Sequence, residues 1–150
     1  MKKISFIICA VAFTLTAYAQ DAKNLCCEDV PVFDVPLDLE EGLRKKETTV
    51  SLDLAQQHPK LTKAPEELTQ LPNLKCLNMS GNRLATFPEN FKELQNLTCL
   101  DLSGNHYLQK LPDFFNEMPN LKIVKMKDLK WPAAKKKEIE TKFPNITFEW

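Results

Sequence analysis

Residues 74–84 read LKCLNMSGNRL and residues 97–105 read LTCLDLSGN, so one pattern of leucine, glycine and asparagine returns after 23 residues. A sequence that repeats with a period of about 20 to 50 residues folds as a stack of similar units. Such a stack presents a broad and regular surface, which suits binding better than catalysis. The repeat therefore predicts a solenoid, and it directs the search for function to an exposed surface.

Each unit contains a short strand, a bend and a helical segment. Leu77 and Met79 alternate with polar residues, as in a strand with one buried face. Gly81 permits a tight bend, and Asn82 can bond backbone groups that the bend leaves unpaired. Pro88 then suits the start of a helical turn. We expect these side chains to face the core: Leu74, Leu77, Met79, Leu84, Phe87, Phe91 and Leu94 in one unit, and Leu97, Leu100, Leu102, Leu108, Leu111, Phe115 and Met118 in the next.

Two weaker copies flank the clear ones and extend the array to about four units. Upstream, residues 52–54 read LDL, and Gln57 takes the place of the bend asparagine. Downstream, the strand half returns once more, and Asp128 lies near the asparagine position without replacing it cleanly. A unit of this kind cannot bury its apolar face alone, so about three or more must stack to form a core.

The motif resembles the leucine-rich repeat, LxxLxLxxNxL followed by xxLPxxFxxLxx, over residues 49–129. The resemblance implies an α/β fold, a right-handed curved solenoid with a parallel sheet on its concave side and short helices on its convex side. It also implies that exposed strand positions of the concave sheet contact a partner.

Both ends of the array carry segments that we expect to cap it. Leu39 and Leu43 lie four residues apart within a predicted helix over residues 37–46. A second helix is predicted over residues 132–142, and alternating apolar residues over 146–150 predict a final strand. We therefore expect an N-terminal segment and cap helix at 20–48, repeats at 49–129, and a C-terminal cap helix and strand at 130–150, which together make a complete small protein.

The first 19 residues have the pattern of a secretory signal peptide. A basic start is followed by an apolar run that is too short to span a bilayer, and Ala17-Tyr18-Ala19 is typical of a cleavage site. We expect cleavage after Ala19 and a secreted or periplasmic chain without a membrane span. The 20 basic and 20 acidic residues then become 18 and 20. Because a basic excess is missing, nucleic acid is not an expected partner.

Carried over by position, the concave face would hold two rows of candidate contact residues. The alternative is an ordinary solvated sheet face, because the large aromatic and arginine side chains that often anchor an interface are missing from it. The first row is Ser51, Cys76, Cys99 and Ile123, the second is Asp53, Asn78, Asp101 and Lys125, and Lys75 and Thr98 flank them.

Cys76 and Cys99 occupy equivalent positions on neighbouring strands, about 5 Å apart. This Cα spacing allows a disulfide, but in-register parallel strands give awkward geometry for one, so free thiols are the expectation. His58 and His106 fall in turns rather than beside the cysteines, which makes a metal site improbable. Adjacent Cys26-Cys27 can pair with each other only with strain, and the alternative that they tie the N-terminal segment elsewhere stays open.

No pattern of catalytic residues emerges, and we expect neither an enzyme nor a cofactor. The carboxylates of Asp53 and Asp101 have no histidine or serine placed with them, and three glycines cannot supply a phosphate-binding loop. The first hypothesis is an interaction module that binds a protein through the concave face. The alternatives are a structural component that self-associates, and a thiol-dependent or metal-linked activity at Cys76 and Cys99.

Overall fold

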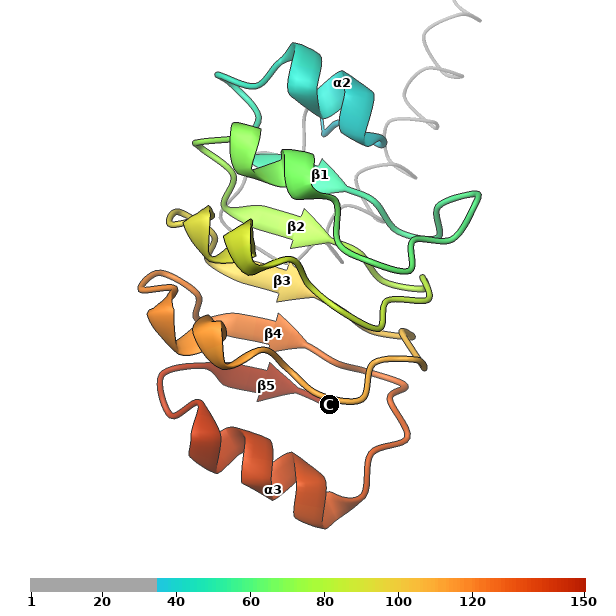
Figure 1. Cartoon of the computed structure of the whole chain (residues 1–150), viewed down its shortest axis with the longest axis vertical. Coiled ribbons are helices and arrows are strands. Elements are labelled where there is room, and N and C mark those ends of the chain that lie inside the picture. Colours follow the sequence, from blue (N-terminus) through green and yellow to red (C-terminus); the bar gives the residue numbers. More distant parts are fainter. Residues whose placement is uncertain (1–34) are drawn as a thin grey trace, which may run out of the picture.

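The computed structural model describes residues 35–150, so the predicted signal peptide and Cys26-Cys27 lie outside the described residues. One layer is a five-stranded parallel sheet in which each strand pairs with the next along the chain, as in a solenoid (Figure 1). The predicted fold class is confirmed. The strands are β1 Ser51–Asp53, β2 Cys76–Asn78, β3 Cys99–Asp101, β4 Ile123–Lys125 and β5 Thr147–Glu149.

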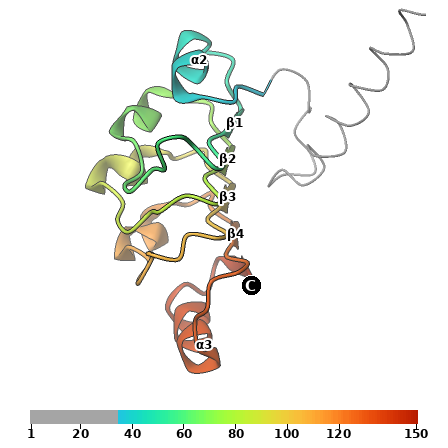
Figure 2. The same cartoon turned by 90° about the vertical axis from the view of Figure 1, so that its right-hand side faces the viewer.

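The second layer lies on the opposite side of the core (Figure 2) and consists of helical turns. From β1 to β4, successive strands are joined by five-residue 3₁₀ helices, a tighter form than the α-helix that is used in short pieces, whereas a ten-residue α-helix joins β4 to β5. A proline precedes each one, with φ of −61°, −71° and −65° at Pro65, Pro88 and Pro112. The elements are α2 Leu39–Arg44, η1 Glu66–Gln70, η2 Glu89–Glu93, η3 Asp113–Glu117 and α3 Ala133–Lys142.

The repeated apolar residues fill the space between the two layers. Leu52, Leu77 and Leu100 align across β1, β2 and β3, and all three are fully buried. Phe91 and Phe115 cover them from the convex side with stacked rings. Burial of one such side chain contributes about 1.5–3 kcal/mol, so the stacked rows supply most of the driving force for folding.

The bend asparagines bond backbone groups of their own unit and of the unit before it. Asn82 Nδ2 donates to the carbonyls of Leu54 and Met79 at 2.8 and 3.0 Å, and Asn82 Oδ1 accepts from the Leu61 amide at 3.2 Å. Asn105 repeats this pattern one unit later and is fully buried. The predicted role of both asparagines is confirmed.

Positive φ angles recur at the residue before the asparagine position. Gly81 and Gly104 have φ of 63° and 69°, a region that glycine enters without steric cost. In the flanking units Gln56 and Asp128 adopt the same conformation at φ of 49° and 61°. The strand register therefore places Asp128 at the glycine position and buried Leu129 at the asparagine position, which resolves the ambiguous sequence alignment there.

Different contacts close the two ends of the stack. At the N-terminal end, Asp38 Oδ1 accepts a hydrogen bond from the Glu41 amide at 2.7 Å and begins α2. Gly42 is buried there, and a Cβ at this position would lie 3.0 Å from Leu52 Cδ1, which explains a glycine inside a helix. At the C-terminal end, the rings of Phe148 and Trp150 stack with centroids 5.6 Å apart.

Candidate functional site

The strand register brings the predicted contact residues together in two rows on the concave face. Ser51, Cys76, Cys99 and Ile123 are direct neighbours, and so are Asp53, Asn78, Asp101 and Lys125. Strand β5 extends each row by one residue that sequence reasoning missed. These are Thr147, beside Ile123, and Glu149, beside Lys125. The alternation of Ile146, Phe148 and Trp150 is the signal that could have found them, since it sends the intervening residues to the other face.

The first row is closed at one end and open at the other. Ser51 is 4% exposed, and Cys76 and Cys99 are 1% exposed, so these three side chains offer little surface to a partner. Ile123 is half-buried and Thr147 is exposed. The row is therefore accessible at the β4–β5 end.

Cys76 and Cys99 are both disulfide-bonded, so the expectation of free thiols is wrong. Free thiols were expected because the geometry is awkward for a bond between Cys76 and Cys99, but each of the two can also bond another cysteine. Both histidines lie in bends or turns, as predicted. Within residues 35–150, no group of three or more histidine, cysteine or acidic side chains is placed to hold a metal ion. Neither finding favours a thiol-dependent or metal-linked activity.

The second row is half-exposed, and part of its chemistry serves the scaffold. The side-chain Oδ1 atoms of Asp53, Asn78 and Asp101 each accept a hydrogen bond from the amide two residues further on, at 2.8, 3.0 and 2.9 Å. Such turns stabilise the exit from a strand. One oxygen of each side chain is thus committed to the backbone, which leaves the other side-chain atoms for contacts at the surface.

The charges of the second row change sign along the sheet. At the β1 end, burial raises the pKa of the Asp53 carboxyl; hydrogen bonds from Ala55 and Asn78 oppose this rise, and the charge of Asp101 adds to it. At the β5 end, Lys125 lies between Asp101 and Glu149 in the register. This end therefore mixes both signs of charge at half-exposed positions, which suits hydrogen bonds and ion pairs with a polar surface.

The two flanking residues lie just before strands β2 and β3. Lys75 is exposed, and its carbonyl accepts hydrogen bonds from the amide and the hydroxyl of Thr98, at 2.8 and 3.0 Å. Their backbones thus continue the ladder between the strands, while the Lys75 side chain adds a positive charge beside the closed part of the first row.

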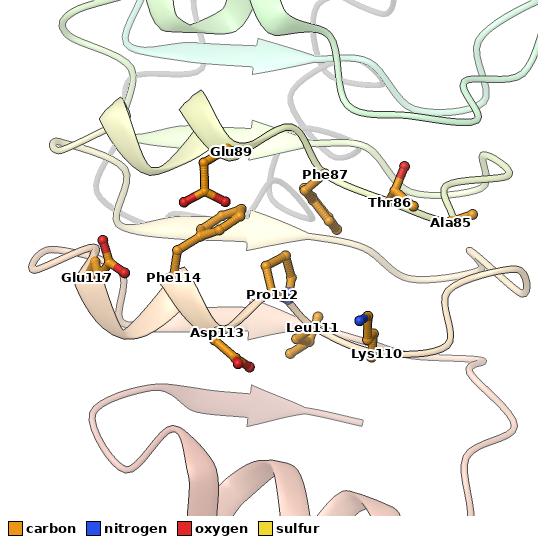
Figure 3. Close-up of a pocket in the computed structure, with 10 residues that line it drawn as sticks. All are labelled: Ala85, Thr86, Phe87, Glu89, Lys110, Leu111, Pro112, Asp113, Phe114 and Glu117. Carbon is orange, nitrogen blue, oxygen red and sulfur yellow. The ribbon is translucent and has the colours of Figure 1, made fainter.

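A depression of about 390 Å³ lies on the convex side between η2 and η3 (Figure 3). Phe87 and Phe114 contribute apolar surface, and Glu89 and Glu117 stand at its rim. Lys92 Nζ contacts both glutamates at 2.9 and 3.4 Å, and its hydrogen bond with Glu89 is the main cause of its raised pKa. Both glutamates at this rim are thus ion-paired with Lys92.

None of the helices within residues 35–150 has the length and apolar character that crossing a bilayer requires.

Comparison with known proteins gives the same picture of a repeat array. Residues 72–116 match the family described as Leucine Rich repeats (2 copies). No curated protein matches the chain. Among solved structures, a leucine-rich repeat protein of Leptospira interrogans superposes with a TM-score of 0.59 at 27% sequence identity. The match covers 68% of this chain and 25% of that protein, so the chain spans about a quarter of its length.

Proposed function

We propose that this chain, which belongs to the leucine-rich repeat proteins, is an exported module that binds a protein partner through the β3–β5 end of its concave face. The fold itself is that of a protein-interaction module. The observation that carries the finer proposal is the row Asp101, Lys125 and Glu149, which is half-exposed and aligned across three neighbouring strands.

Charge and shape at this end favour a polar partner with a small apolar contact. Lys125 is flanked by two carboxylates, so the partner would present charges in the complementary order. Complementary charges give specificity and a faster association rate more than raw affinity. Ile123 and Thr147, which share the other row, supply a modest apolar and hydroxyl surface beside them.

Export and the absence of catalysis are parts of the same proposal. The signal-like residues 1–19 support export, and so do the disulfides of Cys76 and Cys99, because disulfides persist in oxidising compartments and are rare in the cytosol. A non-catalytic role is supported by a concave face on which the side chains of Asp53, Asn78 and Asp101 each bond the backbone at a strand end.

The test compares two variants that make the same chemical changes at different places. The face variant carries Asp101→Asn and Lys125→Gln, in which the asparagine can keep the hydrogen bond to the Ser103 amide. The control carries Lys137→Gln and Glu138→Gln, which are exposed on α3. Each immobilised protein is offered an extract of the organism that makes it, and retained proteins are identified by mass spectrometry.

The proposal expects a protein that binds the unaltered chain and the control at similar levels and binds the face variant at least about tenfold less, a loss of about 1.4 kcal/mol. Thermal unfolding must show that both variants fold. Equal retention by the face variant and the unaltered chain would contradict the assignment of the face.

A further inference from the structure

Two disulfide-bonded cysteines lie almost completely buried on a sheet face whose second row is half-exposed. Cys76 and Cys99 are 1% exposed, whereas Asn78 and Asp101, two residues further along the same strands and on the same face, are half-buried. A side chain on an open sheet face reaches solvent unless something covers it. Both the missing cover and the bonding partners must therefore be accounted for.

Pairing of Cys76 with Cys99 does not explain their burial, and the strand register is unfavourable for a bond between them. The two residues are direct partners in parallel β2 and β3, so their Cα–Cβ bonds leave the sheet side by side. Their Cβ atoms are then about as far apart as the strands, roughly 4.8 Å, while a disulfide prefers about 3.5–4.5 Å. Such a bond would also leave the face uncovered.

We propose that Cys26 and Cys27 are the disulfide partners of Cys76 and Cys99, and that the chain's own N-terminal segment thereby covers β2 and β3 on the concave face. Once the predicted signal peptide with Cys9 is removed, these four are the cysteines of the chain. Adjacent residues have Cα atoms about 3.8 Å apart, which is close to the strand spacing of about 4.8 Å. Cys26 and Cys27 can therefore each bond one cysteine on two neighbouring strands.

The chain has the length and the entry point that this tether requires. The carbonyl of Pro36 accepts a hydrogen bond from the Asp53 amide at 2.9 Å, so the described chain begins beside β1. From there β3 is three strand spacings away, about 14 Å. Nine residue steps separate Pro36 from Cys27, and they can span up to about 30 Å.

Ser51 gives independent support for a cover that starts at β1. It precedes Cys76 in the same row, is 4% exposed, and its Oγ is buried without a hydrogen-bond partner. A segment that runs from Pro36 to Cys76 passes over this position. The proposed function is unaffected, because the β3–β5 end of the second row stays available to a partner.

Each bond forms by thiol–disulfide exchange. A cysteine thiolate attacks a disulfide donor of the exporting compartment, and a second thiolate displaces the donor from the mixed disulfide. Two protons and two electrons leave each cysteine pair, and the donor is reduced to a dithiol. Two turnovers of the donor therefore complete the tether.

Disulfide mapping of the exported full chain tests the proposal without reference to any partner. Trypsin cuts after lysine and arginine, so under non-reducing conditions Cys26-Cys27 falls in fragment 24–44, Cys76 in 76–83 and Cys99 in 93–110. Because no cut separates Cys26 from Cys27, the proposal expects one assembly of all three fragments, which reduction splits into three masses. Fragments 76–83 and 93–110 joined without 24–44 would overturn it.

A variant provides a second measurement. In the exported chain, from which the signal peptide with Cys9 has been removed, Cys26→Ser with Cys27→Ser should give two thiols per chain on titration under denaturing conditions, against none in the unaltered protein. A titration that finds no thiol in this variant would show that Cys76 and Cys99 bond each other and would overturn the tether.

Discussion

The two inner repeats and the two flanking units use different residues to connect each bend to the part of the chain before it. In the inner repeats, buried Asn82 and Asn105 each join their own bend to the unit before it. Gln57 holds the equivalent position in the first unit, and its Nε2 donates instead to the Leu37 carbonyl in the N-terminal cap at 3.3 Å. In the last unit Leu129 takes that position.

The last unit makes its backward contact through an indole. Trp131 Nε1 donates to the Leu108 carbonyl of the preceding unit at 3.1 Å, and the Trp131 ring packs near Trp150. A bend asparagine is thus useful where a full unit lies on each side. At the ends, polar contacts to the cap and aromatic packing replace it.

The largest effect should follow from removing an inner asparagine. Asn105→Ala leaves the Leu84 amide unpaired in a dry interior and removes one of the two donors to each of the Met79 and Leu102 carbonyls. The unsatisfied amide costs about 1–3 kcal/mol and each lost carbonyl bond about 0.5–1.5 kcal/mol, so the free energy of unfolding should fall by about 3 kcal/mol. Gln57→Ala should cost less than about 1 kcal/mol. Urea unfolding measures both, and equal losses would remove the distinction between inner and flanking units.

Substitutions at the glycine position should also affect the stability of inner and flanking units differently. Gly104→Ala puts a side chain at φ 69° and 3.4 Å from the Gly81 backbone, which should cost about 1–2 kcal/mol. Asp128→Gly relieves a comparable conformation at φ 61° but adds freedom to the unfolded chain, so it should change stability by less than about 0.5 kcal/mol. Thermal unfolding checks both, and a tolerated alanine at 104 would contradict the strain argument.

The indole contact of the last unit should have a smaller effect. Trp131→Phe keeps the ring contact but leaves the Leu108 carbonyl unpaired, with an expected loss of about 1 kcal/mol. Trp150→Phe is the matched control, because Trp150 Nε1 donates to Glu140 at an exposed site, where loss of the bond should cost under about 0.5 kcal/mol. If the control loses more in urea unfolding, the backward contact does not stabilise the last unit.

The smallest effect should depend on pH. Burial raises the folded-state pKa of Asp53 above 3.8, so its contribution to stability is present below that pKa and is lost as the pH rises through the raised value. Asp53→Asn should therefore match the unaltered chain at low pH and unfold about 2 °C higher at neutral pH. An asparagine at position 53 can still accept the hydrogen bond from the Ala55 amide, as Asn78 accepts one from the Ser80 amide in the next strand. A neutral-pH Tm that falls would show that the charge stabilises the fold.

Periodicity predicted the features that recur in every unit. The spacing of the leucines gave the strand register, and the Gly-Asn pairs gave the bends with positive φ and the buried amides. These features depend on neighbouring units of the same kind, so they can be read from the repeat alone. The helical segments were predicted without their type, because five residues after a proline suit a 3₁₀ turn as well as the start of an α-helix.

Features that depend on parts outside the repeat were not predicted. Burial of Ser51, Cys76 and Cys99 needs a cover, and a disulfide needs a partner; neither is encoded in the spacing of one unit. Thr147 and Glu149 were missed because β5 lies beyond the recognisable repeats, although its alternation places them on the concave face.

The central functional claim is that a protein partner contacts the concave face at its β3–β5 end. Site-specific photo-crosslinking tests it most directly, with the crosslinker placed at position 125 on β4 or, as the control, at position 137 on α3. We expect a covalent adduct between the partner and position 125 and none at position 137. An adduct at 137 without one at 125 would contradict it.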